Sequence, residues 1–509
     1  MPSVGVRVRR GWRRLGERGP WAQAVSVLVV VAVVGGAVAG ALLASGGGSS
    51  SSSFGASGPT LPATKIPAAT DGVTAHSVEV VFPVINLAAA GGAVGLQGLS
   101  DEKDPDGIRA MVDAANAAGA IHGRTIKADI VQFDPLQPSE MRALCKDWTT
   151  GGHVFAVVDT GKWYDANQLC ITQEGHTPLI SSWTTVTDWT QRGSPYLWWT
   201  GPDQSDVLRN LVPWAISHGL LSPTTKFAIL AGDRASDRLA VDKYLLPALR
   251  AHGLTPTIND VITANLSATT TAQSQARSAV DRLKASGVET VFPLIPVNSF
   301  YAYLSAAHAQ AYRPKMILSD YENSVTDALG LAEFQYPAEL SGQIGPTVYT
   351  LGSEDDDRPS AAAPVPGPGY TPQAKACWQT SVKFYKKQPH PYIEAQGPTM
   401  RWCDAMNLLA KALDLAGPNL NRRTFVEALG QIQSFPTALT PMMTFGPNRH
   451  AGPIEYRTVR PIKNGSTTDA SVNHCPPCRP APNACGTNHD LPFHGSCWQI
   501  VEDFQPFSP

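Results

Sequence analysis

From residue 76 onward, the chain alternates short apolar runs with segments in which apolar residues recur every three or four positions. The short runs are rich in Val, Ile and Phe, which is typical of buried strands, and the periodic segments are typical of amphipathic helices. Strands that alternate with helices predict parallel sheets joined by helical crossovers. The expected strands are residues 78–84, 126–133, 154–158, 226–231, 288–295, 315–319 and 343–349.

Two such series of strands and helices follow one another along the chain. The alternation is interrupted near residues 198–206, and helical periodicity returns from about residue 371. We therefore predict an α/β fold with two lobes over residues 76–460, each lobe a mostly parallel sheet flanked by helices. The expected boundaries are about 76–203 and 353–440 for lobe 1, and about 204–352 and 441–460 for lobe 2.

The first 75 residues have a different character. Residues 1–21 carry six arginines, and residues 22–44 form an uncharged run rich in Val, Ala and Leu. About 20 apolar residues can cross a bilayer, and arginines on the N-terminal flank keep that end in the cytoplasm. We predict a basic cytoplasmic segment and a transmembrane signal-anchor helix, with a cleaved signal peptide as the alternative. Residues 45–75, rich in Gly, Ser and Pro, are then a flexible linker to a domain outside the cytoplasm.

Composition and charge narrow the class of partner. Hydrophobic residues make up 43% of the chain and charged residues 16%, which is enough apolar material for a sizeable core. The formal net charge is -2, so the chain lacks the basic surplus that phosphate backbones attract. Nucleic acid is therefore not an expected partner.

All eight cysteines lie in the part expected outside the cytoplasm, where disulfides persist. Cys145 and Cys170 fall on expected helices that follow successive strands, and Cys377 and Cys403 fall on consecutive helices, so we expect two disulfides. Residues 461–509 form a Cys-rich extension that contains Cys475, Cys478, Cys485 and Cys497. Two further disulfides are expected there. A zinc site is the alternative, although the spacing fits no firm zinc template, and we expect no metal and no cofactor.

Several motifs recur in an order and spacing known from one family. Residues 116–124 read NAAGAIHGR and lead through a strand to FDP at 133–135, and PLISS follows at 178–182. TQRG at 190–193 and FGPNRH at 445–450 come later. Over most of residues 78–460 the chain thus resembles the type I periplasmic binding proteins of the leucine-binding family, the ligand-capturing subunits of ABC importers. Gly119 and Gly123 would turn the chain from helix into strand.

In open α/β sheets, ligands bind beyond the carboxyl ends of the strands. The resemblance implies that two lobe 1 loops supply hydroxyl and backbone donors to a ligand carboxylate. These donors would be Thr160 and Gly161 in one loop, and Ser182, Thr184 and Thr185 in the other. Serine and threonine also commonly cap helices, which is the structural alternative.

Two tryptophans, Trp163 and Trp183, stand where the family's amino-acid binders more often have small residues, and this departure favours an aromatic or largely apolar ligand. The alternative is that both pack in the core. For lobe 2, the resemblance implies that Asp320 faces a ligand cation and that Tyr321 donates its hydroxyl, although Asp320 is also suited to cap a helix. The remaining expected cleft-loop residues are Asn86, Arg234, Asp237, Pro296 and Asn298.

The sequence contains no HExxH, GxSxG or P-loop motif, so no enzyme activity is expected. The leading hypothesis is capture of a small organic solute, amino-acid-like or aromatic, by closure of the two lobes, with delivery to an ABC permease. The second hypothesis is a sensor or scaffolding ectodomain that keeps the fold but binds a protein or cell-wall component.

Overall fold

The computed structural model describes residues 66–86, 104–119, 121–160, 163, 166–321, 336–340, 342–349, 371–385, 397–462 and 497–508. All described residues belong to one compact unit within residues 56–509. The expected anchor helix, residues 22–44, lies outside the described residues, as do Gly161, Cys475, Cys478 and Cys485. Among the residues that the structure describes, no helix has both the length and the apolar character needed to span a bilayer.

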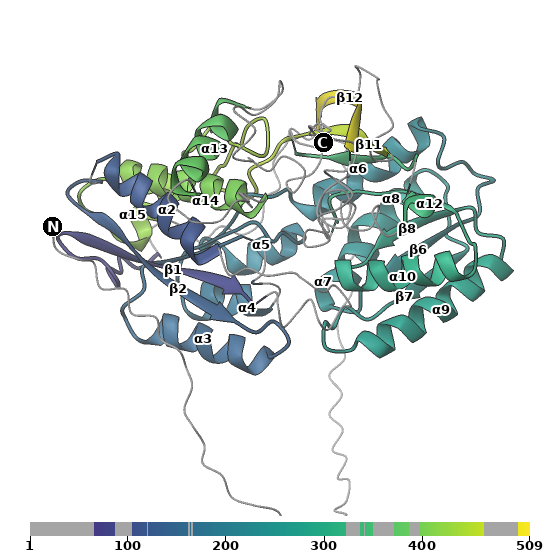
Figure 1. Cartoon of the computed structure of the whole chain (residues 1–509), viewed down its shortest axis with the longest axis horizontal. Helices are drawn as coiled ribbons and strands as arrows, with labels where there is room; N and C mark the ends of the chain where they lie inside the picture. Colours follow the sequence, from purple (N-terminus) through teal and green to yellow (C-terminus); the bar gives the residue numbers. More distant parts are fainter. Residues whose placement is uncertain are drawn as a thin grey trace, which may run out of the picture. The chain divides into compact units, whose positions relative to one another are not determined.

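Lobe 1 is built on a parallel sheet of five strands in the order β2-β1-β3-β4-β5 (Figure 1). Helices α2, α13, α14 and α15 pack against one another, and in Figure 1 they lie on the opposite side of this sheet from α3 and α4. The strands are β1 (Ser77–Ile85), β2 (Thr125–Phe133), β3 (Ala156–Asp159), β4 (Leu179–Ser181) and β5 (Leu197–Trp199). The helices are α2 (Asp104–Ala117), α3 (Pro138–Thr150), α4 (Ala166–Leu169), the π-helical turn η2 (Cys170–Glu174), α5 (Thr187–Gly193), α13 (Pro372–Tyr385), α14 (Gly397–Ala416) and α15 (Arg422–Leu429).

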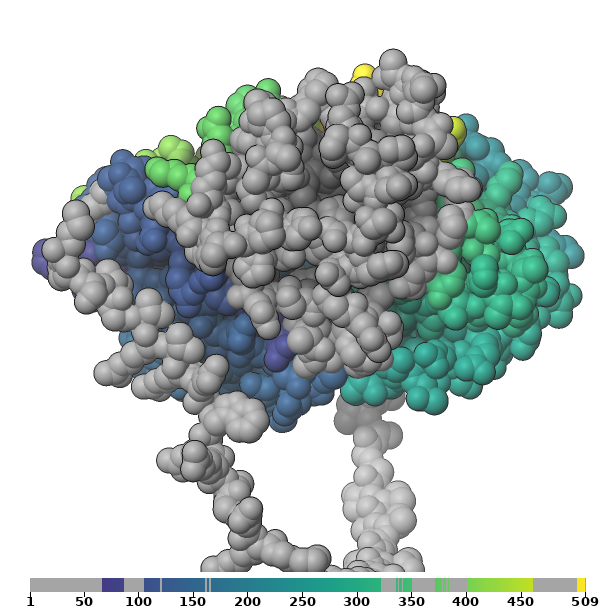
Figure 2. All heavy atoms as spheres, in the orientation of Figure 1, coloured from purple at the N-terminus to yellow at the C-terminus, as the bar shows by residue number. Residues whose placement is uncertain are grey.

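Lobe 2 is built on a second parallel sheet, of four strands in the order β7-β6-β8-β9. In Figure 2 its teal and green atoms lie on the other side of the view from the blue atoms of lobe 1. The strands are β6 (Phe227–Ala231), β7 (Ile258–Val261), β8 (Thr290–Leu294) and β9 (Lys315–Met316). The helices are α6 (Gln204–Ser217), α7 (Ala235–Ala240), the π-helical turn η3 (Val241–Leu245), α8 (Leu246–Ala251), α9 (Thr269–Ala285), α10 (Val297–Ala309) and α12 (Pro337–Leu340).

A third, antiparallel sheet joins late parts of the chain. It consists of β10 (Gly345–Thr347), β11 (Glu455–Ile462) and β12 (Cys497–Pro506), in that order. The run at 343–349 was expected to extend a parallel sheet, but it forms β10 here. Because β12 pairs with β11, the boundary expected at residue 460 falls inside this sheet. The indole of Trp214 on α6 donates to the hydroxyl of Thr458 on β11, which ties the sheet to lobe 2.

The expected linker is shorter than residues 45–75 at its C-terminal end. Ile66 is buried, and its carbonyl accepts a hydrogen bond from Arg423. The amide of Arg422 donates to the carbonyl of Ala69. Residues 66–69 are therefore held against α15 by hydrogen bonds to their backbone carbonyls, which composition alone does not reveal.

Two disulfides cross-link lobe 1 at the pairings expected from the sequence. Cys145 on α3 is bonded to Cys170 on η2, and Cys377 on α13 to Cys403 on α14. All four residues are buried. Each bridge closes a loop of about 25 residues and so restricts the unfolded chain.

Candidate functional site

The strand ends of both lobes carry buried polar side chains. In lobe 1, Thr160 follows β3, and Ser182, Thr184 and Thr185 follow β4. In lobe 2, Pro296 comes shortly after β8, and Asp320 and Tyr321 lie a few residues beyond β9. A parallel sheet brings the carboxyl ends of its strands to one edge, so each lobe collects its own set of loops.

A buried hydrogen-bond network fixes the two lobe 1 loops. The hydroxyl of Ser181 donates to Asp159 Oδ2 at 2.8 Å, and the amide of Trp163 donates to Asp159 Oδ1 at 3.2 Å. Gln168 on α4 donates to Ser181 Oγ and to the carbonyl of Trp183. Buried polar groups that are paired in this way hold a single geometry. The network therefore fixes the loops after β3 and β4 relative to each other and to α4.

Trp163 packs in the core of lobe 1, which is the alternative given for this residue in the sequence analysis. Its side chain is fully buried, in edge-to-face contact with Phe133 and tilted against Trp148. Its indole N–H donates to the carbonyl of Asn167 at 3.0 Å. A large aromatic side chain whose polar atom is already satisfied contributes to the core, and that is its place here.

The first residue of α6 connects the two lobes. Gln204 donates from Nε2 to Thr184 Oγ1 at 2.7 Å and to the carbonyl of Asp320 at 3.3 Å. Its backbone amide donates to the carbonyl of Thr185. Thr184 and Asp320, predicted from opposite lobes, are thus brought together through one amide. No sequence motif marks Gln204, apart from its position at the break between the two strand series.

Lobe 2 residues form a clamp centred on Asp237. This carboxylate accepts two hydrogen bonds at 2.9 Å from the guanidinium of Arg234, and a third at 2.9 Å from the hydroxyl of Tyr321. A Cβ on Gly232 would lie 2.1 Å from Asp237 Oδ2, so the close approach requires glycine. Asp320 accepts from the amide of Val348 at 2.7 Å and so also holds the chain near β10.

The clamp orients Arg234 toward lobe 1. The guanidinium carbon of Arg234 lies 5.4 Å from the ring centroid of Trp183. A cation over an indole face is attracted by the ring quadrupole. Trp183 is partly exposed, in contrast to Trp163. Of the two predicted tryptophans, Trp183 is therefore the one that lies at the junction of the lobes.

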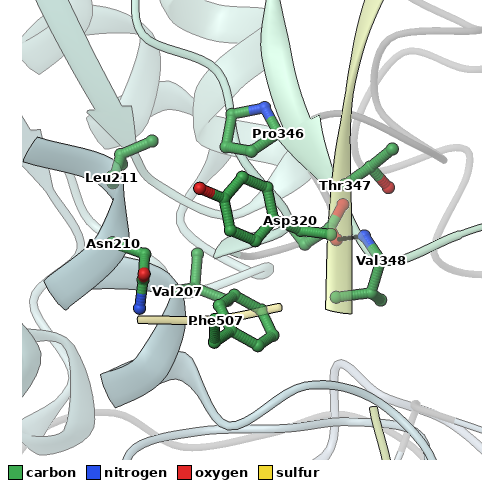
Figure 3. A pocket seen from close by; sticks show the side chains of 9 residues that line it. Val207, Asn210, Leu211, Asp320, Pro346, Thr347, Val348 and Phe507 are labelled. Carbon is green, nitrogen blue, oxygen red and sulfur yellow. Dashed lines mark hydrogen bonds between the residues drawn. The ribbon is translucent and has the colours of Figure 1, made fainter. Parts of the chain in front are cut away.

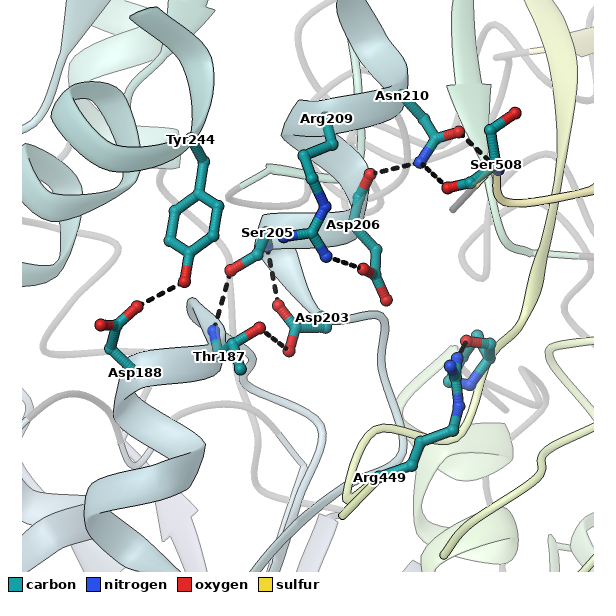
Figure 4. Close-up of polar contacts among 11 residues, drawn as sticks. Thr187, Asp188, Asp203, Ser205, Asp206, Arg209, Asn210, Tyr244, Arg449 and Ser508 are labelled. Atoms are coloured by element: carbon teal, nitrogen blue, oxygen red, sulfur yellow. Dashed lines mark hydrogen bonds and ion pairs between the residues drawn. The ribbon is translucent and has the colours of Figure 1, made fainter. Parts of the chain in front are cut away.

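Further polar contacts surround this junction (Figure 4). Asp188 on α5 accepts hydrogen bonds from Lys243 and Tyr244 on η3, across the lobes. Burial acts to raise the pKa of Asp188, but the hydrogen bonds from Lys243 and Tyr244 outweigh it, so this pKa is lowered. Asp203, the N-cap of α6, accepts from Thr187 and from the amide of Ser205. Burial, with repulsion from nearby Asp206, raises the pKa of Asp203 to about 7.

A model of the family described as "Periplasmic binding protein" matches residues 84–465. The chain belongs to the periplasmic binding protein family. The resemblance inferred from the sequence motifs is thereby confirmed, together with the type I α/β fold. This family consists of solute-binding proteins, which are not enzymes, and its binding domain is extracytoplasmic.

Solved structures share this periplasmic binding protein fold at low identity. A solute-binding protein of an ABC transporter from R. palustris, in complex with 4-hydroxybenzoate, has a TM-score of 0.57 and 13% identity, covering 85% of this chain and 98% of that one. A fatty acid ABC transporter substrate-binding protein from Thermomonospora curvata has a TM-score of 0.57 and 15% identity, with coverage of 86% and 94%. An ABC transporter substrate-binding protein from Desulfitobacterium hafniense, in complex with Leu, has a TM-score of 0.51 and 14% identity, with coverage of 76% and 97%. No curated protein matches the sequence.

Two small pockets lie near the place where lobes 1 and 2 meet. The first lies between α6 and the C-terminal segment (Figure 3). The second lies beside the loop after β4, where Ser182 and Thr200 face Arg401 and Asp404 of α14. The lining of the first pocket comprises Val207, Asn210, Leu211, Asp320, Thr347 and Phe507, among others. Arg401 was not predicted from the sequence, because it lies within an ordinary amphipathic helix and no motif marks it.

Proposed function

We propose that this protein captures a small organic solute between its two lobes for an ABC importer. The observation that carries the proposal is the contact between strand-end loops of opposite lobes. Trp183 of lobe 1 meets Arg234 of lobe 2, and Gln204 bridges Thr184 to Asp320. A solute that touches both sets of loops favours the closed arrangement, because binding energy shared between lobes shifts the balance toward closure.

Unsatisfied polar atoms at these loops support the same proposal. Within the described part of the chain, the hydroxyl of Ser182, the carboxamide oxygen of Gln204 and both carboxamide atoms of Asn298 are buried without a hydrogen-bond partner. Buried polar atoms are rarely left unpaired in folded proteins. A polar ligand at the junction would supply their partners.

The relatives indicate which solutes to try first. Those described above bind 4-hydroxybenzoate, a fatty acid and leucine, all of which are carboxylic acids with an apolar body. We infer the same broad class for this chain. Thr160, Gly161, Ser182, Thr184 and Thr185 are proposed to contact the solute from lobe 1. Pro296, Asp320 and Tyr321 are proposed to do so from lobe 2, with Trp183 against an apolar part.

The uncharged run at 22–44 is proposed to anchor the binding domain to the membrane as a single span, with the basic residues 1–21 in the cytoplasm. The domain would then remain within reach of a membrane-embedded permease.

Calorimetry on the full chain, purified in detergent, tests the binding proposal. The panel contains amino acids, aromatic acids and fatty acids, and we expect at least one to bind with a Kd in the micromolar range. Trp183→Ala should raise that Kd about 10-fold. Trp163→Phe, the control in the core, should lower Tm and leave the Kd unchanged. Binding by no member of the panel, or equal binding by the Trp183→Ala variant, would contradict the proposal.

A further inference from the structure

Three segments of the chain connect lobe 1 to lobe 2. The first, residues 200–203, leads from β5 into α6. The second leaves β10 and returns the chain to α13, and the structure describes its residues 348–349 and 371. The third, residues 452–454, leads into β11. Domains that move about a hinge do so through changes in a few backbone dihedrals of such connections. The stiffness of these segments therefore governs how easily the lobes move apart.

The third connection is held by hydrogen bonds at each of its three carbonyls. The first carbonyl accepts from the amide of Thr444 at 2.9 Å, and the second accepts from the guanidinium of Arg449 at 2.8 Å. The third, that of Ile454, accepts from the amide of Phe507 at 3.1 Å. Two of the donors thus come from the part of the chain just before the connection, and one comes from the end of the chain.

The C-terminal segment, Phe507 and Ser508, lies where all three connections enter lobe 2. The ring of Phe507 packs on Tyr456 of β11, with centroids 5.2 Å apart. It also lines one pocket with Asn210 of α6 and with Val348, which follows β10 (Figure 3). The amide and the carbonyl of Ser508 both bond to the carboxamide of Asn210, at 2.7 and 3.3 Å. One short piece of chain therefore contacts the lobe 2 end of every connection.

The strand that precedes this segment, β12, is fastened to the same helix. The indole of Trp214 donates to Thr458 Oγ1 at 2.9 Å, and Thr458 donates to Glu502 Oε2 at 2.6 Å. The ring of His218 stacks on that of Trp214, and its Nε2 lies 3.2 Å from the same oxygen of Glu502. Asn210, Trp214 and His218 are spaced four residues apart, so they form one stripe along α6. The end of the chain is docked along this stripe.

We propose that the C-terminal segment acts as a strap across the hinge and limits how far the lobes open when no solute is bound. Opening changes the backbone dihedrals of residues 452–454, and this moves the carbonyl of Ile454 relative to lobe 2. Because β12 is fastened to α6 and β11, Phe507 stays with lobe 2 and does not follow. The hydrogen bond between Phe507 and Ile454 therefore opposes opening. This inference rests on the lobe closure of the proposed function and adds to it a device that regulates closure.

Pulsed electron paramagnetic resonance on the full chain in detergent, without solute, tests the strap. Amino acids that carry spin labels replace Lys146 on α3 of lobe 1 and Arg277 on α9 of lobe 2, both of which are exposed. The variant lacks residues 507–509 and keeps the whole of β12. We expect its ratio of open to closed conformers to rise about 2- to 10-fold, the effect of losing one typical hydrogen bond. Asn210→Ala, which removes the two bonds to Ser508, should give a smaller rise.

Val501→Ala is the matched control, because Val501 is exposed on β12. It should leave the distances between the labels unchanged, and a rise as large as that of the shortened chain would contradict the strap. Calorimetry gives a second measure. A smaller closed population weakens the apparent affinity in proportion. For any solute that binds, the Kd of the shortened chain should therefore rise, by no more than the factor found for the ratio of conformers.

The possible failures can be told apart. Circular dichroism checks that each variant is folded. If the folded shortened chain and the wild type give the same distances, the strap is refuted, while solute binding itself stands. Should the shortened chain be unfolded, Asn210→Ala decides the matter, because an unchanged ratio of conformers in that variant would also refute the strap. If the wild type binds no solute, the proposed function is contradicted, and the distances, which are measured without solute, still decide on the strap.

Discussion

Asp188 on α5 of lobe 1 accepts a hydrogen bond from the hydroxyl of Tyr244 on η3 of lobe 2. Lys243, the preceding residue, donates to the other oxygen of the same carboxylate. One side chain of lobe 1 therefore joins two side chains of lobe 2. Because Lys243 is half exposed, the ion pair contributes little to the stability of the fold. Under the proposed function, this contact between the lobes would favour their closed arrangement.

Asp188→Asn should weaken solute binding by about 2- to 5-fold, because it removes a charge pair between the lobes worth about 0.5–1 kcal/mol, which would favour the closed arrangement under the proposed function. The melting temperature should change little. Calorimetry measures the Kd, and small-angle scattering of the unliganded full chain should detect a larger radius of gyration.

Asp242→Asn is the matched control for this contact, since Asp242 is an exposed carboxylate on the same turn. Acid provides a second check. Because the pKa of Asp188 is lowered, its charge and the contact persist as the pH falls to the ordinary range of a carboxylate and are lost only below it. A radius of gyration that is unchanged in Asp188→Asn would rule out a role for this contact in closure.

The stability of the fold should decrease as the pH rises toward neutrality, through Asp203. The pKa of this carboxyl is raised to about 7 by burial and by Asp206, so the folded state keeps a proton that the unfolded state releases near pH 4. Between about pH 4 and 7 the unfolded state binds fewer protons, and the free energy of unfolding falls. Asp203→Asn keeps a carbonyl oxygen for the amide of Ser205 and removes the titration.

Between pH 4.5 and 7.5, the free energy of unfolding should fall in both proteins. We expect this fall to be smaller in the Asp203→Asn variant than in the wild type, by about 1–2 kcal/mol. Urea unfolding at a series of pH values measures this difference. Asp206→Asn should give a smaller effect in the same direction, since it removes the repulsion and leaves the burial. Parallel curves for the wild type and Asp203→Asn would show that Asp203 does not titrate in this range.

The clamp on Arg234 should be sensitive to a single methyl group. In Gly232→Ala the new Cβ would meet Asp237 Oδ2 at 2.1 Å, and Asp237 is fixed by Arg234 and Tyr321. The expected cost is about 1–3 kcal/mol of unfolding free energy. Solute binding should also weaken, because Arg234 meets Trp183. The control is Gly107→Ala on α2, where a Cβ has open space and should stabilise the helix by about 0.5–1 kcal/mol.

The sequence predicts best the strands that are long and rich in branched apolar side chains. β1 and β2 are nine-residue runs rich in branched side chains, and they pair along their whole length. β5 has only three residues, two of them tryptophans, and β7 is an edge strand with Asn259 and Asp260 in its middle. Both are strands because of their neighbours. No period of hydrophobicity can be read from so few residues.

The sequence indicates which loops follow the strands, but it does not indicate where the side chains of those loops point. Thr184 and Asp320 were expected at the cleft because they follow strands, and they are joined through Gln204. Trp163 belongs to an expected cleft loop but turns into the core. The place of a residue after a strand indicates where its backbone lies and leaves the direction of its side chain open. Gln204 and Arg401 lie beside the loops only because of tertiary packing. No local sequence pattern predicts these positions.

The C-terminal segment, residues 507–508, should stabilise the fold through its contacts with β11 and α6. Phe507 packs on Tyr456 with ring centroids 5.2 Å apart, and Ser508 exchanges two hydrogen bonds with Asn210 of α6. Phe507→Ala should therefore lower the free energy of unfolding by about 1–2 kcal/mol through lost apolar burial. Val501→Ala on β12, the strand that ends just before Phe507, removes part of an exposed side chain and should change it by less than about 0.5 kcal/mol. Urea denaturation of the two variants measures both values, and equal midpoints would mean that the segment adds nothing to the stability of the lobes.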